Sequence, residues 1–374
     1  MVKLGTVISQ AKNIRCGEHN YPVLSMTMHD GLIFQDDKFK KVIASANRSE
    51  YKVVYRNQLV VSFPIDEGVL AAQRITDVGI VSPAYTIWDI DQAKILPEFL
   101  EYALRCDRSI NYYKAKLRGS TARRRSLPTP TLLEHTIPLP AIDAQRYILE
   151  IIHKSRNVLE TRKIQLQKLD MLVRARFVEM FGDPNINSKK WNECPLSKKL
   201  NVLGGYAFKS DQFDEKGGIP VLRIGNINAG YFKPVNMVYW QKDESLERYV
   251  MYPGDLVMSL TGTVGKDDYG NVCILDDDYE MYYLNQRNAK LEIKEGIDKY
   301  YLSQLLKFEQ IKKRLTGISR GVRQANISNK DILNLVVPIP PLELQNQFAD
   351  FVKHVDKSKL QYHPHTHTCQ PNTS

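Results

Sequence analysis

The sequence repeats itself: one order of features recurs after roughly 200 residues, a period far longer than that of solenoid repeats. Residues 21–24 (YPVL) correspond to residues 219–222 (IPVL), and the apolar run at 59–62 corresponds to the run at 256–259. In both copies, apolar residues at helical spacing then predict one helix that ends at a glycine, Gly119 in the first copy and Gly317 in the second. The chain is therefore predicted to contain two versions of one domain.

Each copy closes in a Pro-x-Pro segment, at residues 138–140 and 338–340, that leads into another helix. The first of these helices is predicted over residues 142–181, which contain neither glycine nor proline. Its apolar residues alternate in spacings of four and three, as in a coiled-coil seam that binds a partner. The predicted partner-binding residues are Ile148, Ile152, Leu159, Leu166, Leu169, Val173 and Met180. The alternative is a long amphipathic helix packed on its own domain, because polar residues interrupt the stripe.

Short runs rich in Val, Ile and Tyr, bounded by Gly, Asn and Asp, predict strands mixed with one or two helices in each copy. The predicted fold class is α+β, with two tandem domains of mixed α/β structure separated by long coiled-coil-type spacer helices. A helix of about 40 residues would form a rod of roughly 60 Å. The predicted segments are a first domain at 1–141, the long helix at 142–181, a linker at 182–191, a second domain at 192–341, a shorter helix at 342–360 and a disordered tail at 361–374.

Positive charge is concentrated in the first half of the chain, within a formal net charge of +10. Residues 1–190 contain 29 basic and 20 acidic side chains, which suits a polyanionic partner. Two basic segments without acidic residues occur at matched places in the two copies, where Arg and Lys can bind DNA phosphates. The candidate DNA-binding residues are Lys114, Lys116, Arg118, Arg123, Arg124 and Arg125, then Lys266, then Lys312, Lys313, Arg314, Arg320 and Arg323. The alternative for each segment is a solvated helix end, where cations favour the helix dipole.

Motifs of catalytic machinery are missing from the sequence. Residues 262–266 (GTVGK) resemble part of a phosphate loop, but the first glycine is absent and Asp267 stands where Ser or Thr is required. The sequence has no H-E-x-x-H motif, no G-x-S-x-G elbow and no dinucleotide-binding glycine motif. We therefore predict a non-catalytic chain that itself binds no cofactor.

Cysteine usage and hydropathy indicate the compartment. The five cysteines are scattered and form no C-x-x-C pair, which argues against disulfides and a zinc site. The only metal-like cluster, His363, His365, His367 and Cys369, lies in the tail that is predicted to be disordered. No apolar run approaches the roughly 18 residues that a membrane span requires. We expect a cytoplasmic protein without a metal and without membrane contact.

Five strings of the second copy, taken in order, resemble the specificity subunits of type I restriction-modification systems. They are residues 205–210 (GYAFKS), 219–227 (IPVLRIGNI), 254–259 (GDLVMS), 284–287 (LNQR) and 338–345 (PIPPLELQ). The duplication and the junction at residues 181–184 (FGDP) add to this resemblance, which covers about residues 1–360.

The resemblance implies a function as well as an architecture. Each domain would read one half of a bipartite target in double-stranded DNA. The spacer helices would bind two methyltransferase subunits and, through them, the restriction subunits. S-adenosylmethionine and ATP with Mg²⁺ would be bound by these partners, whose complex methylates adenine and defends the cell against foreign DNA.

Two features depart from the family pattern. The first copy has no clear equivalent of residues 205–210 or 262–266, as expected for domains that read different DNA sequences. The second spacer helix is about half as long as the first, which predicts a weakened methyltransferase contact. Two alternatives remain open: the specificity subunit of a related system with one fused cleavage and methylation partner, and a coiled-coil scaffold that binds proteins.

Overall fold

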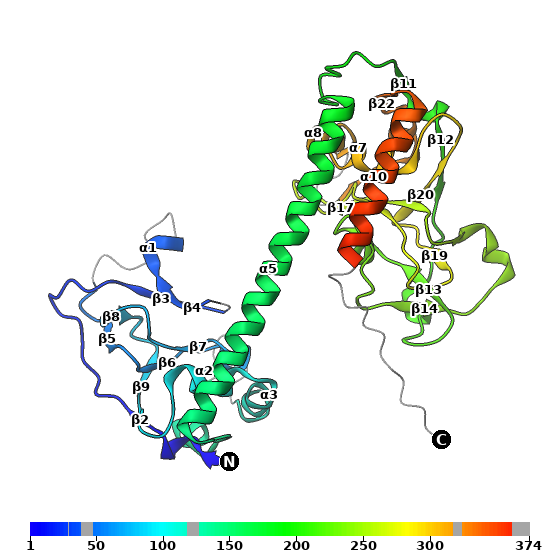
Figure 1. Ribbon diagram of the computed structural model, residues 1–374. Coiled ribbons are helices and arrows are strands. Elements are labelled where there is room, and N and C mark those ends of the chain that lie inside the picture. Colours follow the sequence, from blue (N-terminus) through cyan, green and yellow to red (C-terminus); the bar gives the residue numbers. More distant parts are fainter. Residues whose placement is uncertain (29, 39–47, 118–126, 317–323, 361–374) are drawn as a thin grey trace. The chain divides into compact units, whose positions relative to one another are not determined.

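The computed structural model describes residues 1–28, 30–38, 48–117, 127–316 and 324–360 (Figure 1). The chain divides into two compact units, Met1–Glu160 and Thr161–Ser374. The long helix α5 (Ile142–Phe181) contributes its first half to one unit and its second half to the other. Among the residues described, no helix is both long and apolar enough to cross a membrane.

The first unit is built on a four-stranded antiparallel sheet of order β2-β9-β6-β7, with smaller sheets β1-β10, β3-β4 and β5-β8. Leu59 in β6 pairs with Trp88 in β9, and both side chains are buried in the main core of this unit. The strands are β1 (Val2–Lys3), β2 (Ile8–Gln10), β3 (Leu24–Thr27), β4 (Gly31–Phe34), β5 (Lys52–Tyr55), β6 (Leu59–Val61), β7 (Leu70–Ala72), β8 (Val78–Val81), β9 (Thr86–Ile90) and β10 (Thr136–Ile137). The helices are α1 (Gln35–Lys38), α2 (Pro97–Arg105), α3 (Asp107–Lys116) and α4 (Thr129–Glu134).

The second unit contains a sheet of the matching order, β12-β20-β16-β18, and a second four-stranded sheet, β14-β13-β19-β15. The strands are β11 (Glu193–Pro195), β12 (Leu200–Gly204), β13 (Ile219–Leu222), β14 (Val238–Trp240), β15 (Val250–Met251), β16 (Leu256–Ser259), β17 (Thr261–Thr263), β18 (Val272–Ile274), β19 (Tyr282–Leu284), β20 (Asn288–Ile293), β21 (Gln324–Asn326) and β22 (Val336–Pro338). The helices are α6 (Ile224–Ile227), α7 (Lys299–Leu306), α8 (Glu309–Thr316), α9 (Asn329–Asn334) and α10 (Leu342–Leu360).

The two units share one topology in their main sheets. The apolar runs that match in sequence become β6 and β16, and each lies beside the equivalent long strand, β9 or β20. A parallel pairing also recurs, between Val23 and Ile80 in the first unit and between Val221 and Tyr283 in the second. Helices α2, α3 and α4 recur in order as α7, α8 and α9. The sequence repeat is therefore a repeat of folded structure.

One prediction about the helices is wrong. The sequence pattern indicated a single helix before each basic segment, but the structure has two: α2 and α3 in the first unit, and α7 and α8 in the second. In the first unit the break is at Cys106, whose backbone is extended. The bend places both helices on one core, since Leu104 of α2 and Tyr113 of α3 are both buried in it. The Tyr113 hydroxyl also donates to the Leu104 carbonyl at 3.2 Å. The glycines expected to end these helices, Gly119 and Gly317, lie outside the described residues.

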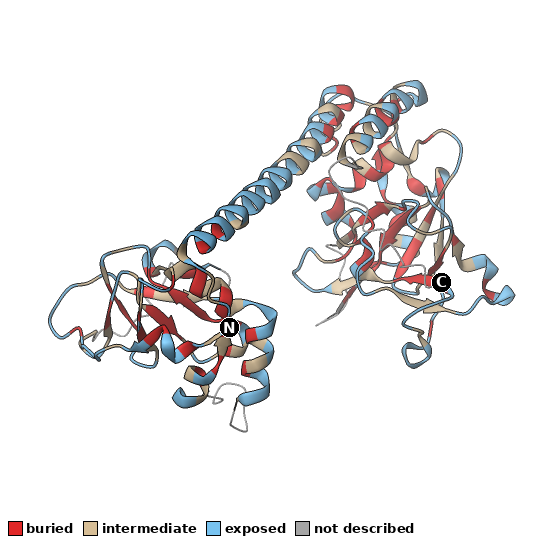
Figure 2. Cartoon of the chain, turned by 60° about the horizontal axis from the view of Figure 1, so that its bottom comes forward, coloured by how far each residue is buried: buried red, intermediate tan, exposed pale blue. Residues whose placement is uncertain are grey.

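The C-terminal half of α5 is part of the second core. Phe177 is fully buried and its ring centroid lies 5.3 Å from that of Tyr301 in α7 and 5.4 Å from that of Phe348 in α10. Helix α10 lies beside this part of α5 (Figure 1), and Lys359 near its end binds Asp170 at 2.8 Å. Figure 2 shows buried residues in the interior of each unit and exposed residues along much of α5.

Candidate nucleic-acid interface

A hydrogen-bonded loop follows β17 and presents Lys266 to solvent. Both carboxylate oxygens of Asp268 bind Thr263, Oδ1 accepting from its backbone N–H at 2.8 Å and Oδ2 from its hydroxyl at 2.9 Å. These hydrogen bonds, led by the one from the backbone N–H, hold the pKa of Asp268 below its usual value. The Asp268 carboxylate lies close against the backbone of Gly262, since a Cβ added to Gly262 would collide with it.

The same loop does not have the structure of a nucleotide-binding phosphate loop. Such a loop joins a strand to a helix whose N-terminus binds the phosphates. Here the element that follows residues 262–266 is the strand β18, and the residues between form turns and bends. The likeness to a phosphate loop is therefore confined to the sequence.

Lys312 was predicted to bind DNA, but the structure places it in a buried environment. Its side chain is only 9% exposed, and its ammonium binds the Asp267 carboxylate and donates to Asn271 Oδ1 at 2.7 Å. A lysine held in this way ties α8 to the loop that carries Lys266. Its surroundings suit a positioning residue rather than a direct phosphate contact.

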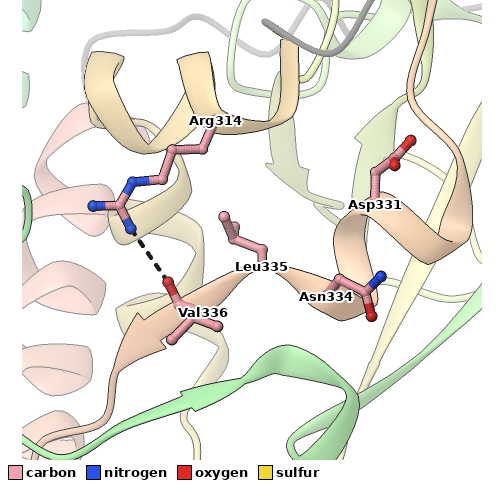
Figure 3. A pocket seen from close by; sticks show the side chains of 5 residues that line it. All are labelled: Arg314, Asp331, Asn334, Leu335 and Val336. Carbon is pink, nitrogen blue, oxygen red and sulfur yellow. Dashed lines mark hydrogen bonds between the residues drawn. The ribbon is translucent and has the colours of Figure 1, made fainter.

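Lys313 and Arg314, the next two candidates, lie in the last turn of α8 rather than in the loop after it. Lys313 is exposed and binds Glu309 at 2.6 Å. Arg314 lines a pocket with Asp331, Asn334, Leu335 and Val336, and points toward Val336 (Figure 3). Its guanidinium donates to the carbonyls of Val336 at 3.3 Å and Asn185 at 3.4 Å. Arg314 thus joins the segment after α5 to β22.

In the first unit, Lys114 and Lys116 lie in the last turn of α3, and both are exposed. The remaining arginine candidates, four after these lysines and two after Arg314, lie outside the described residues: Arg118, Arg123, Arg124, Arg125, Arg320 and Arg323. Their role in DNA binding stays a prediction from sequence.

The structure adds a feature that the sequence reasoning did not single out as a site, the turn between β19 and β20. Its residues Gln286 and Arg287 are exposed, whereas the strands on both sides are largely buried. Tyr206 lies against this turn, since its carbonyl accepts from the Gln286 N–H at 2.8 Å. In the sequence these residues belong to the string 284–287 (LNQR), which carried part of the family resemblance and was given no role in binding.

The predicted seam of α5 divides into two parts. Val173 and Met180 are buried in the core of the second unit, and Leu169 packs against that core. In the half that belongs to the first unit, Ile148 is 37% exposed and Leu159 is 70% exposed, while Ile152 and Leu166 are half-buried. Of the predicted seam residues, only the less buried ones are therefore accessible to a partner protein.

No group of three or more His, Cys, Asp and Glu residues that could hold a metal ion occurs within the ranges the structure describes. The histidine-rich tail, with His363, His365, His367 and Cys369, lies outside those ranges.

Comparison with known proteins places these features in a family context. Residues 188–365 match the model of the type I restriction modification DNA specificity domain. The specificity subunit of the type I restriction enzyme MjaVIII of Methanocaldococcus jannaschii is 28% identical over 243 residues, which are 59% of this chain and 55% of that protein. That of the EcoBI enzyme of Escherichia coli is 29% identical over 164 residues, 43% of this chain and 31% of that protein. The matches thus span about half, or less, of the length of these curated relatives.

Two solved structures share the fold along nearly the whole chain. One belongs to a type I restriction-modification system and covers 96% of this chain and 92% of its own, with a TM-score of 0.52 and 16% identity. The S subunit of such a system from M. genitalium covers 96% of this chain and 90% of its own, also with a TM-score of 0.52 and 16% identity. The predicted fold class of tandem mixed α/β domains with a long spacer helix is confirmed. The resemblance to specificity subunits is confirmed as well.

Proposed function

We propose that this chain, similar in sequence and fold to the specificity subunits of type I restriction-modification systems, is the DNA-specificity subunit of such a complex. In this role the chain catalyses no reaction and selects the DNA site at which its partners act. Each of the two units reads one half of a bipartite target in double-stranded DNA. The single observation that carries the proposal is the recurrence of one sheet order, β2-β9-β6-β7 and β12-β20-β16-β18, in a chain with a DNA specificity domain.

The duplication supports a two-part target for a geometric reason. Two copies of one fold that differ in their exposed side chains can bind DNA in equivalent ways and still read different bases. The formal charge of +10 supports the polyanionic partner. Phosphate contacts from exposed cations such as Lys114, Lys116, Lys266 and Lys313 would set the register of each unit on the duplex.

The partners follow from the same proposal. Two methyltransferase subunits would bind the spacer helices, with exposed apolar residues of α5 such as Ile148 and Leu159 in the contact, because apolar side chains left in water favour a protein partner. Restriction subunits would join through the methyltransferases. S-adenosylmethionine, and ATP with Mg²⁺, would be held by those subunits and not by this chain.

The salt dependence of DNA binding tests this proposal on the isolated chain. Binding of a fluorescent mixed-sequence duplex is measured by anisotropy between about 50 and 200 mM salt. A protein that neutralises phosphates should lose affinity steeply, with a slope of about −0.9 per phosphate contact in a double-logarithmic plot. Weak binding that does not change with salt would contradict the proposal and favour a scaffold that binds proteins.

A further inference from the structure

The first half of α5, residues 142–160, has the same place in the first unit as α10 has in the second. His153 Nε2 lies 2.8 Å from a carboxylate oxygen of Glu98 in α2. At the matching position of α10, the Lys353 ammonium lies 5.5 Å from the ring centroid of Tyr300 in α7. Because α2 and α7 are equivalent helices, one side of each long helix is packed on its own unit in the same way.

In the second unit, a further side of α10 is covered by the second half of α5. The Phe348 ring centroid lies 5.4 Å from those of Phe177 and Phe181, and Phe348 is fully buried. Near the other end of α10, Lys359 binds Asp170 at 2.8 Å. An early residue of α10 thus contacts late residues of α5, and a late residue contacts an earlier one. The cover of α10 is therefore one antiparallel helix with large apolar side chains.

The matching side of α5 in the first unit is exposed. Ile148, at the position equivalent to Phe348, is 37% exposed, and Leu159, at the position equivalent to Lys359, is 70% exposed. Both belong to a group of apolar residues whose helical spacing places them on one side of α5. This exposed α5 face consists of Tyr147, Ile148, Ile151, Val158 and Leu159. Apolar side chains gathered on a surface in this way mark a site of protein contact.

The structural repeat also indicates what the partner of this face must look like. In the second unit, the ammonium of Lys359 compensates the carboxylate of Asp170. In the first unit Leu159 replaces this lysine, so a carboxylate opposite Leu159 would be buried without a partner, which is unfavourable. The helix that covers the exposed α5 face should therefore have an apolar side chain opposite Leu159.

The exposed α5 face of a second copy of this chain meets that requirement. All five of its residues are uncharged, and in an antiparallel pair the Leu159 end of one face lies opposite the Tyr147 end of the other. Such a pairing is self-complementary, as a two-fold interface requires. The second half of α5 is not available for this contact, because Phe177 is buried against α10 in its own unit.

We propose that the free chain forms a two-fold dimer in which the exposed α5 faces of two copies pack antiparallel. This inference goes beyond the proposed function, since it concerns the chain without its partners. The pairing removes apolar side chains of both copies from water, which stabilises the contact. Binding of a methyltransferase at Ile148 and Leu159 would compete with it.

Sedimentation velocity of the full chain over about a hundredfold range of concentration tests the proposal. At high concentration the wild type should sediment with twice the mass of one chain. Ile151→Asp and Leu159→Asp should each weaken the association on the order of a hundredfold, because each dimer would bury two unpaired carboxylates. The matched control is Met171→Asp, which replaces a 70% exposed apolar residue of α5 in the second unit and should keep the dimer.

The outcomes separate the inference from the proposed function. A wild type that stays monomeric, or that sediments as assemblies larger than two chains, would overturn the dimer. Equal association of the wild type and both face variants would overturn it too, as would loss of the dimer in Met171→Asp, because the contact would then lie elsewhere. Thermal unfolding of each variant at the wild-type midpoint verifies that the fold is intact. A monomer whose DNA binding still falls steeply with salt would contradict the dimer and leave the proposed function standing.

Discussion

Gln145 and Gln345 bind the same backbone groups in the two units. The side-chain oxygen of Gln145 accepts from the Leu96 N–H and that of Gln345 from the Asp298 N–H, both at 2.8 Å. Each amide nitrogen donates to a proline carbonyl of its Pro-x-Pro segment, at 2.8 Å in the first unit and 2.7 Å in the second. Both glutamines are fully buried. Each therefore fixes the start of α5 or α10 to the start of an equivalent helix of its own unit, α2 or α7.

Replacement of Gln145 by alanine should destabilise the first unit by about 2–4 kcal/mol, because the Leu96 N–H and two carbonyls lose their partner in the interior. Urea unfolding followed by circular dichroism measures the effect. Gln167→Ala, an exposed glutamine of the same helix, is the matched control and should change stability by less than about 0.5 kcal/mol. Equal midpoints for the two variants would show that the buried hydrogen bonds are not needed.

His135 should make the first unit sensitive to acid. It is buried, its Nε2 lies 2.8 Å from the Ser109 hydroxyl, and burial, followed by the charge of Arg108, lowers its pKa below the ordinary 6.5. Because of this lowered pKa, the unfolded chain binds a proton at His135 more readily than the folded chain does. The stability that neutral His135 contributes is therefore present above pH 6.5 and is lost as the pH falls.

The unfolding midpoint of the first unit, measured at several pH values between about 5 and 8, tests this expectation. His135→Gln keeps a polar partner for Ser109 but cannot titrate, so its midpoint should depend less on pH than that of the wild type. His19→Gln, at an exposed position, should leave the pH dependence as it is. A wild-type slope in the His135 variant would contradict the assignment.

Lys312 and Lys313 are neighbours in sequence that should behave differently. Lys312→Ala leaves Asn271 without its donor and removes a buried side chain, which should cost about 1–3 kcal/mol. Lys313→Ala removes one exposed ion pair and should cost less than about 0.5 kcal/mol while weakening DNA binding. Thermal unfolding and anisotropy on both variants measure the two effects. A stable Lys312 variant with weakened DNA binding would restore Lys312 as a phosphate contact.

Arg123 and Arg124 are expected to bind phosphates irrespective of base sequence. The double alanine variant should bind unrelated duplexes more weakly by the same factor, and its salt slope should be shallower by about 0.9 for each phosphate that the variant no longer neutralises. Arg146→Ala, an exposed residue of α5, is the control of equal side-chain type. An unchanged slope in the double variant would remove these arginines from the interface.

Much of the fold could be predicted because it depends on local patterns. Absence of glycine and proline from residues 142–181 indicated α5, and Gly182, with φ of +80°, supplies the backbone conformation that ends it. The duplication was visible because both copies keep their apolar runs in one order. The break at Cys106 could not be foreseen, since apolar spacing continues across it and only the packing of Tyr113 against α2 requires the bend.

The site was predicted less well, because exposure and pairing depend on residues far apart in sequence. Lys312 is paired with residues 41 and 45 positions away, which no local pattern reveals. Val173 and Met180 fit a coiled-coil seam in sequence, but the aromatic side chains around Phe177 draw them into the core of their own unit.

Exchange of residues 192–336 for those of another specificity subunit should alter one half of the recognised DNA sequence and leave the other half and the gap unchanged. The reason is that each unit has its own cores among its own residues. Target sequences of parent and chimera are compared by sequencing of selected duplexes. A chimera that kept the full parental target would contradict modular recognition.

The most direct test of the central claim is to express the chain together with the methyltransferase encoded beside it and to map methylated adenines across the host genome by single-molecule sequencing. We expect a motif of two short specific parts separated by a gap of fixed length, methylated only when both proteins are present. Methylation at a single uninterrupted motif, or no new methylation from a soluble and folded complex, would contradict the assignment of one half-site to each unit.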